Sequence, residues 1–355
     1  MRLSSVEVIP YALHFEEPYV TARGMLRQRE MVLLRAWDED GVVGLGEAVP
    51  LALRGGVGLR EVVAELEGWG EHREMDGLSA PARCAVETAL IDLRGKRIGK
   101  EAGKGVRDEA VPCNATLVAG PPDAVAAEAE RWARDGFSTF KLKLGAETAK
   151  MVPGEPFLRS RDVEQVRAVR EALGPGVRIR VDANEAWDLE TAKAALAALE
   201  PYEIELAEQP VAGLEAMAAL AASTSIPLAA DESVANLAEA EEAAALGACA
   251  YTGIKLSKVG GPGEALAIAD VLPAYVTSAL DGPVGIAAAA QVALSLAETG
   301  HPERLHLAHG LATQRLFAST IASVECEIRD GFLHLPPGPG LGVEIDEEAL
   351  QAHRI

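Results

Sequence analysis

Hydrophobic and polar positions alternate in the segment 139–145, TFKLKLG, in the manner of a β-strand. Because successive side chains of a strand point to opposite faces, Phe140 and Leu142 lie on one face, whereas Lys141 and Lys143 share the other. The apolar face argues against a solvent-exposed strand. The pattern therefore predicts a buried strand that directs two ammonium groups toward the interior of the protein.

From about residue 111 onward, short apolar segments of this kind alternate with amphipathic helical patterns, most of which end near Gly or Pro. Eight strand candidates are 111–117, 139–145, 178–184, 204–210, 227–233, 251–257, 274–281 and 304–310. Strands that recur at intervals of mostly about 23 to 26 residues, each with its own helix, are typical of a (β/α)8 barrel. This arrangement favours a barrel over an open, doubly wound sheet.

The first hundred residues have a different pattern. Residues 31–50 contain two apolar runs separated by the turn signal DEDG at 38–41, which predicts a hairpin, and residues 80–100 have apolar positions at helical intervals. The chain beyond the barrel returns to strands and turns. We therefore expect an α/β protein with a TIM-type barrel at 108–319. An α+β capping domain would combine residues 1–107 with the C-terminal segment 320–355, which returns to it.

Composition narrows the classes of partner. The 355 residues carry a formal net charge of −21, which argues against nonspecific contact with nucleic acid or anionic lipid. A small anionic substrate stays compatible with this charge, because a metal ion or a lysine pair can reverse the local field. Neither a signal peptide nor a membrane-spanning stretch is evident, so a cytoplasmic protein is expected. The oligomeric state is left open, and a homo-oligomer is one option.

The cysteines are widely scattered and suggest neither a zinc motif nor a disulfide framework. They are Cys84, Cys113, Cys249 and Cys326. We interpret them as small buried thiols.

Charged and polar side chains stand at the carboxyl ends of successive strand candidates, where the active site of such a barrel lies. In chain order they are Lys141 and Lys143, Asp182 and Asn184, Glu208, Asp231, and Lys255. Three carboxylates crowded into a low-dielectric cavity repel one another unless a cation lies between them. All-oxygen ligation suits Mg²⁺, for which Mn²⁺ can substitute, better than zinc.

The lysines suggest what such a cation is for. A divalent ion that binds a substrate carboxylate acidifies the neighbouring α-proton, and a neutral amine can then remove that proton. We expect the pKa of Lys143 to be lowered toward neutrality by the metal and by a second ammonium group. Lys255, from the opposite side, would reach the other face of the substrate. Lys141 would contact the substrate carboxylate and depress the pKa of its neighbour.

Five motifs in this order, KLK, VDAN, AEQP, ADES and IKLSKVGG, resemble the enolase superfamily and specifically its muconate-lactonizing-enzyme subgroup. The resemblance extends over nearly the whole chain and includes GEAVPL and CAVETALIDL in the capping region. It implies that Asp182, Glu208 and Asp231 bind Mg²⁺. It further implies that Lys143 is the acid/base on one face of the substrate and that Lys255 lies on the other.

Within the subgroup, VPCNATL, VTSALDGPVGIAAAAQVA and GPGLGVEID are similar to the o-succinylbenzoate synthase family. The resemblance implies syn-dehydration of 2-succinyl-6-hydroxy-2,4-cyclohexadiene-1-carboxylate in menaquinone biosynthesis. We predict that Asn184, Ser278 and Asp281 contact the substrate, although TS at 277–278 and LDGP at 280–283 depart from the pattern of the family. We place Arg23 in a loop over the barrel mouth, either against the succinyl carboxylate of the substrate or simply solvated.

Other activities stay open. An N-acylamino acid racemase, a dipeptide epimerase or a muconate cycloisomerase would use the same groups. The epimerase is disfavoured because the last strand candidate lacks the acidic pair that would hold an α-ammonium. A further alternative is not an enzyme at all: a barrel without catalytic activity that binds a ligand or partner.

Overall fold

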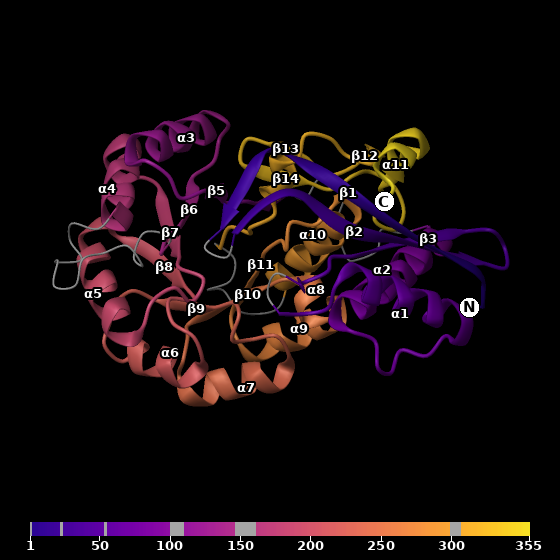
Figure 1. The fold of residues 1–355 in the computed structure, drawn as a ribbon, viewed down its shortest axis with the longest axis horizontal. Coiled ribbons are helices and arrows are strands. Elements are labelled where there is room, and N and C mark those ends of the chain that lie inside the picture. Colours follow the sequence, from indigo (N-terminus) through magenta and orange to yellow (C-terminus); the bar gives the residue numbers. More distant parts are fainter. Residues whose placement is uncertain (1, 22–23, 53–54, 100–109, 146–160, 299–306) are drawn as a thin grey trace.

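The structure is a computed structural model that describes residues 2–21, 24–52, 55–99, 110–145, 161–298 and 307–355. One part of the described chain is an antiparallel sheet with helices packed against it, and the other is a curled parallel sheet surrounded by helices (Figure 1). None of the helices in these ranges combines the length and apolar composition needed to cross a bilayer.

The antiparallel sheet has the order β1-β2-β3, with β1 at Leu3–Thr21, β2 at Gly24–Asp38 and β3 at Val43–Ala48. Strands β2 and β3 form the predicted hairpin, which is confirmed. Helices α1 (Leu59–His72) and α2 (Ala80–Arg97) pack against this sheet, and α2 confirms the helix expected at 80–100. Gly46 of β3 lets α2 approach closely, because a Cβ atom there would lie 1.9 Å from the backbone oxygen of Ala85.

The parallel sheet has the order β11-β10-β9-β8-β7-β6-β5. Its strands, in chain order, are β5 (Ala115–Leu117), β6 (Thr139–Lys143), β7 (Arg178–Asp182), β8 (Ile204–Glu208), β9 (Leu228–Ala230), β10 (Tyr251–Ile254) and β11 (Ala274–Val276). Parallel bridges from Cys113 to His309 and from Thr277 to Gly310 connect the two edges through the last strand candidate. Residues 307–310 thus complete the barrel, and the predicted TIM-type fold class is confirmed.

Helices follow the strands on the outside of the barrel (Figure 1). They are α3 (Pro122–Arg134), α4 (Arg161–Leu173), α5 (Leu189–Leu199), α6 (Leu214–Ala221), α7 (Leu237–Leu246), α8 (Leu256–Val259), α9 (Pro262–Val271) and α10 (Pro283–Glu298). Two of them begin at side-chain caps: Asp188 accepts from the backbone N–H of Thr191 at 2.8 Å, and Asn236 from that of Glu239 at 3.0 Å. Short 3₁₀ helices lie at Glu200–Tyr202 and Ala312–Leu316.

The segment 111–117 differs from the prediction of a single barrel strand. Its first part belongs to β4 (Ala110–Pro112), which pairs with β14 (Phe332–His334) in a sheet that also contains β13 (Glu327–Arg329). The second part, β5, belongs to the barrel sheet, and the bridge from Cys113 to His309 directly precedes it. The backbone N–H of Cys113 donates to Gly331 and that of Asn114 to His309, so the chain crosses from one sheet to the other at this point.

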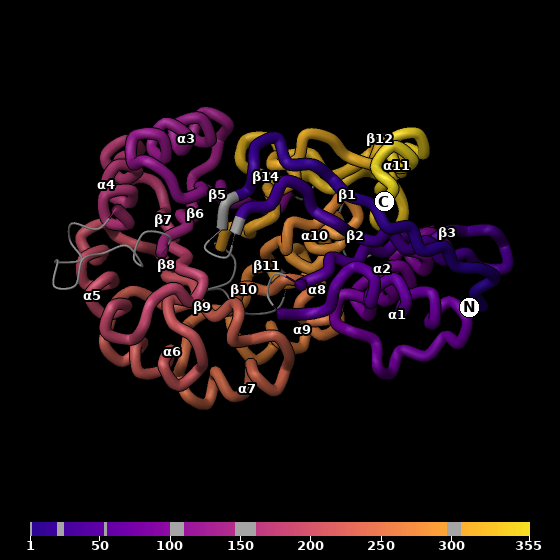
Figure 2. Tube along the Cα trace, viewed as in Figure 1, coloured from indigo at the N-terminus to yellow at the C-terminus, as the bar shows by residue number. Residues whose placement is uncertain are grey.

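The C-terminal segment lies against the long hairpin of β1 and β2 (Figure 2). It contains β12 (Ala322–Val324), which pairs with β15 (Glu344–Ile345), and α11 (Glu347–His353). The rings of Phe15 and Phe317 stack with centroids 4.9 Å apart, and an antiparallel bridge joins Tyr11 to Arg354. These contacts hold the middle of the hairpin, whose Tyr19 and Leu26 lie nearer the turn and line the barrel pocket.

The interior of the barrel is filled below the carboxyl ends of its strands. Leu206, Ala229, Tyr275 and Leu307 form a buried cluster there, and the Arg180 guanidinium lies over the Tyr275 ring at 5.0 Å from its centroid. Arg180 also donates to the backbone oxygen of Ala308 at 2.7 Å. This packed layer closes the barrel from below, so a ligand can enter only at the opposite end.

Candidate active site

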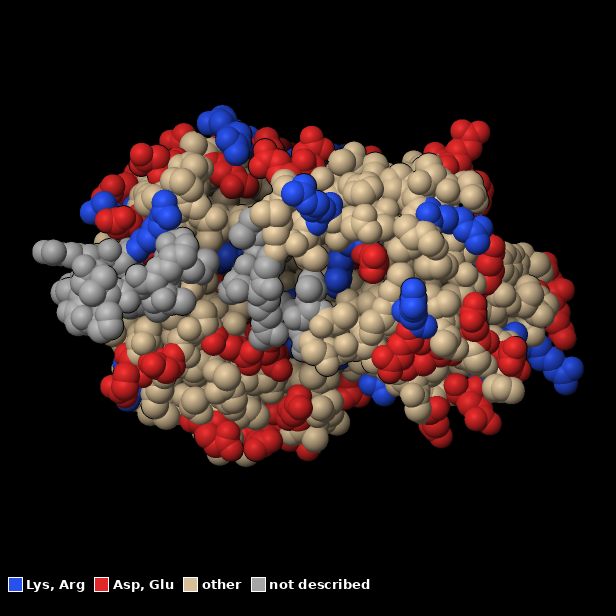
Figure 3. All heavy atoms as spheres, in the orientation of Figure 1, with Lys and Arg blue, Asp and Glu red and all other residues tan. Residues whose placement is uncertain are grey.

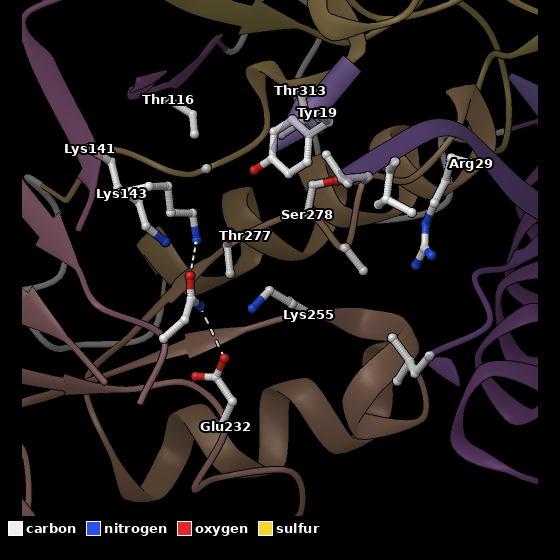
Figure 4. A pocket seen from close by; sticks show the side chains of 16 residues that line it. Tyr19, Arg29, Thr116, Lys141, Lys143, Glu232, Lys255, Thr277, Ser278 and Thr313 are labelled. Atoms are coloured by element: carbon white, nitrogen blue, oxygen red, sulfur yellow. Dashed lines mark hydrogen bonds between the residues drawn. The ribbon is translucent and has the colours of Figure 1, made fainter. Parts of the chain in front are cut away.

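A pocket opens at the carboxyl ends of the barrel strands, beneath the hairpin of β1 and β2 (Figure 4). The hairpin contributes Tyr19, Leu26 and Arg29, and residue Leu51 follows β3. The barrel contributes Thr116, Lys141, Lys143, Asn184, Glu232, Lys255, Thr277, Ser278, Ala279, Leu280, Gly310 and Thr313. Acidic side chains are spread over the outer helices, whereas Lys and Arg atoms are visible beside the central hollow (Figure 3). The pocket is therefore a basic site in a strongly acidic protein.

Lys141 and Lys143 both point into this pocket from β6, as the alternation of the strand predicts (Figure 4). Lys141 is only 5% exposed, and its Nζ lies 2.6 Å from Glu208 Oε2 and 2.9 Å from Asp182 Oδ2. The Nζ of Lys143 lies 2.5 Å from the same Asp182 oxygen. Two ammonium groups are thus held in the interior because buried carboxylates face them.

The three predicted metal ligands are all fully buried, with exposures of 0%. Their order follows the register of the sheet, in which Lys143 lies opposite Asp182, and Asp182 lies opposite Glu208. Asp231 directly follows β9, and its backbone N–H donates to Gln209 Oε1 at 2.8 Å. The structure therefore brings these acids to the same end of three consecutive strands, just below the lysine side chains.

Lys255 enters the pocket from the end of β10, across from the two lysines of β6 (Figure 4). It donates to Asp231 Oδ2, and its side chain is nearly buried. A further lysine, Lys258, lies 3.0 Å from Asp231 Oδ1 and also donates to the Asp231 backbone oxygen. Asp231 is therefore held by cations on both carboxylate oxygens.

The pKa of Lys143 is raised in this arrangement, whereas the lowered pKa was predicted for a site with bound metal. Burial acts to lower the pKa of this ammonium group, but Asp182, together with Tyr19 and Glu208, raises it on balance. Burial opposes the charged form of Lys141 too, yet Asp182 and Glu208 raise its pKa. For Asp182, burial acts to raise the pKa, and the two lysines overcome it and lower the pKa. Both β6 lysines are therefore ammonium groups in this arrangement, because the carboxylates contact them directly.

Whether a metal ion fits these carboxylates depends on their spacing and on their donor atoms. In the ranges that the structure describes, no three or more His, Cys, Asp or Glu side chains lie close enough together to hold one. The donor set nevertheless suits a hard cation such as Mg²⁺, since it consists of oxygen atoms alone. In addition, Glu208 Oε1 is buried without a hydrogen-bond partner, which is costly unless another group satisfies it.

Some of the residues predicted to contact the substrate line the pocket, and others do not. Lys141, Asn184 and Ser278 line the pocket, and Asn184 accepts from Lys143 Nζ at 3.0 Å while donating to Glu232 Oε1 at 3.1 Å. The structure places Asp281 behind the lining, where it accepts from the Ser278 hydroxyl at 2.7 Å. Arg23 lies outside the described residues.

Several site residues were missed in the sequence. Tyr275 donates to Glu208 Oε2 at 2.5 Å, and Gln209 binds both Asp231 and the backbone N–H of Ser233. Alternation along β11 could have revealed Tyr275, since it shares a face with Thr277. Lys258 and Glu232 stand within the recognised motifs IKLSKVGG and ADES, so closer attention to those motifs could have found them.

Comparison with known proteins agrees with this geometry. Residues 124–349 match the family model described as "Enolase C-terminal domain-like". The chain is 35% identical over 286 residues to an o-succinylbenzoate synthase of Thermobifida fusca, covering 79% of this chain and 83% of the relative. A muconate lactonizing enzyme of Pseudomonas fluorescens, in complex with muconolactone, has a TM-score of 0.88 and 29% identity, with 99% of each chain covered.

A dipeptide epimerase of Enterococcus faecalis, in complex with Mg and L-Leu-L-Tyr, has a TM-score of 0.86 and 25% identity. That match covers 97% of this chain and all of the epimerase chain. The matched family model and these structures agree with the barrel and its capping sheet. The chain is an enzyme of the enolase superfamily and belongs to its muconate-lactonizing-enzyme subgroup.

Proposed function

We propose that the protein is a Mg²⁺-dependent o-succinylbenzoate synthase that dehydrates 2-succinyl-6-hydroxy-2,4-cyclohexadiene-1-carboxylate. The observation that carries the proposal is the pair of lysines, Lys143 and Lys255, on opposite sides of one pocket above three buried carboxylates. This arrangement suits removal of a proton next to a substrate carboxylate. The 35% identity to a relative with this activity supports the choice of reaction.

Asp182, Glu208 and Asp231 would hold the ion. When bound there, Mg²⁺ supplies positive charge opposite the substrate carboxylate and thereby makes the neighbouring proton more acidic. With Asp182 engaged as a ligand, its charge would be less available to Lys143, so Lys143 would be able to release its proton and act as a base. Lys141, held between Asp182 and Glu208, provides a fixed ammonium group for the substrate carboxylate.

Lys143 would then carry out both proton transfers. As an amine it takes the α-proton, and as an ammonium group it returns a proton to the departing hydroxyl on the same face. One C–H and one C–O bond break, a C=C bond forms, and water leaves as the ring becomes aromatic. Lys255 remains protonated beside Asp231 and stabilises the developing negative charge from the other face.

Racemisation of N-acylamino acids is the second candidate, favoured by the position of Lys255. Its side chain reaches the pocket itself, so it can protonate or deprotonate a substrate on the face opposite Lys143. Racemisation requires proton transfer on both faces, whereas syn-dehydration requires it on one. The two functions therefore differ in how much they depend on Lys255.

The test measures formation of the aromatic product with Lys143→Ala, Lys255→Ala and a control, Lys193→Ala, whose exposed lysine pairs with Glu190 on α5. We expect Lys143→Ala to reduce kcat by about 10²-fold or more, Lys255→Ala to leave measurable dehydration, and the control to match the unaltered protein. Absence of product from the unaltered protein with MgCl₂ would refute the synthase assignment. Racemisation of N-acylamino acids that is lost in both lysine variants would then support the second candidate.

A further inference from the structure

The turn after β11 forms one wall of the pocket and holds an unusual backbone conformation. Ser278, Ala279 and Leu280 all line the pocket. Leu280 has a φ of 67°, in the left-handed region that a branched residue without glycine's freedom rarely adopts. Such a conformation persists only when the surrounding structure enforces it, and it is often found where a side chain must be aimed at a ligand.

Asp281 enforces the turn from behind. Its Oδ2 accepts from the Ser278 hydroxyl at 2.7 Å and from the backbone N–H of Ala279 at 2.6 Å, while its own backbone N–H donates to Ser278 Oγ at 2.9 Å. The carboxylate is 5% exposed. These three bonds restrain the backbone on both sides of Leu280 and so fix the position from which its side chain extends into the pocket wall.

Glu47 anchors the same turn from the other part of the protein. It comes from β3 of the antiparallel sheet, and its Oε1 accepts from the backbone N–H of Gly282 at 2.6 Å, at the start of α10. Its Oε2 accepts from the Tyr11 hydroxyl at 2.9 Å. Glycine is required beside it, because a Cβ atom at Gly282 would lie 2.2 Å from the Tyr11 hydroxyl and one at Gly285 would lie 2.6 Å from Glu47 Oε1.

We propose that Leu280 determines which substrates fit, and that Glu47 is a positioning residue that fixes Leu280 across the contact between the antiparallel sheet and the barrel. The proposal shares one assumption with the proposed function: a substrate loses the proton next to its carboxylate in this pocket. Leu280 would set the size of the apolar group that a substrate can carry. The hairpin, which also lines the pocket, would then be kept in register with this wall by Glu47 and Tyr11.

The test compares α-proton exchange in D₂O with MgCl₂ for two probes, N-acetylalanine and N-acetylphenylalanine, which differ in the size of the apolar group. In Leu280→Ala, we expect the ratio of kcat/KM for the larger over the smaller probe to rise by about tenfold or more. In Glu47→Gln, we expect the ratio to change in the same direction, through KM more than through kcat, because the turn is no longer anchored.

Asp92→Asn is the matched control. Asp92 is equally buried and accepts from the backbone N–H groups of Leu45 and Leu341, but it does not touch the turn. Its replacement should leave the probe ratio unchanged even if it lowers stability. An unchanged ratio in Leu280→Ala, in a protein whose exchange activity persists, would overturn the proposal and leave the proposed function intact.

Two further outcomes separate the parts of the proposal. If Glu47→Gln is folded and keeps the ratio of the unaltered protein, the anchoring role of Glu47 is overturned. If the unaltered protein exchanges neither these probes nor the cyclohexadiene substrate, the proposed function fails, and the specificity proposal fails with it. If Glu47→Gln does not fold, the ratio of kcat/KM for the two probes in Leu280→Ala still decides whether Leu280 determines which substrates fit.

Discussion

Replacement of Glu208 by glutamine separates the structural from the metal-binding role of this carboxylate. Glu208 is fully buried on β8. Its Oε2 atom lies 2.6 Å from Lys141 Nζ and accepts a hydrogen bond from the Tyr275 hydroxyl at 2.5 Å. Glutamine keeps the shape of the side chain but removes its charge. Lys141 then retains only Asp182, at 2.9 Å, as a carboxylate partner.

The magnitude follows from this remaining contact. Loss of one partner of an isolated buried ion pair costs about 3–5 kcal/mol, because an uncompensated charge is left behind. Since Asp182 still faces Lys141, we expect Glu208→Gln to lower the free energy of unfolding by a smaller amount, about 1–3 kcal/mol. Bound Mg²⁺ should add about 2.7 kcal/mol to the unaltered protein at a concentration 100 times its Kd, and much less to the variant.

Denaturant unfolding with and without MgCl₂ measures both effects. The matched control is Glu205→Gln, on the same strand, which loses the ion pair to Arg180 but leaves the three carboxylates intact. The control should be destabilised and still be stabilised by Mg²⁺. The reasoning is refuted if Mg²⁺ stabilises Glu208→Gln as strongly as the unaltered protein, because Glu208 would then not be a ligand.

Two other predictions concern stability. Burial and the nearby Asp281 raise the pKa of Glu47 to about 7. The folded state therefore holds the Glu47 proton more tightly than the unfolded state does. The free energy of unfolding should fall by about 3 kcal/mol as pH rises from about 4.5 to 7. Glu47→Gln should lose this part of the dependence in urea unfolding series, and an unchanged slope would contradict the assignment. Gly46→Ala should destabilise the protein by about 1–3 kcal/mol or more, because the new methyl group meets the backbone of α2, whereas Gly68→Ala in α1 has open space and should stabilise it by about 0.5–1 kcal/mol. Thermal unfolding of the two glycine variants checks both signs, and equal effects would contradict the packing described for β3 and α2.

Much of the barrel and the placement of its charged strand-end residues could be predicted because both follow from local periodicity. Alternation along 139–145 correctly places Lys141 and Lys143 on the inner face, and the order of the strands correctly brings Asp182, Glu208 and Asp231 to the same end of the barrel. These features depend on short stretches of chain and on one rule of barrel architecture.

The rest depends on contacts between distant residues. The division of the segment 111–117 depends on its partners: Ala110–Pro112 pairs with β14, more than 200 residues along the chain, whereas Ala115–Leu117 joins the barrel. Glu47 and Gly282 are 235 residues apart, and no spacing rule connects them. The raised pKa of Lys143 in this arrangement depends on the distance to Asp182, which a sequence does not contain; the lowered pKa, predicted for a site with bound metal, stays a prediction.

The central claim is that buried carboxylates hold a magnesium ion between opposed lysines, where a substrate carboxylate loses its α-proton. Its most direct test is formation of the aromatic product from 2-succinyl-6-hydroxy-2,4-cyclohexadiene-1-carboxylate, followed by absorbance and NMR across a titration of MgCl₂. The account predicts turnover that rises with Mg²⁺, disappears with EDTA and is lost in Lys143→Ala. Turnover that is indifferent to EDTA, or that persists without Lys143, would contradict it.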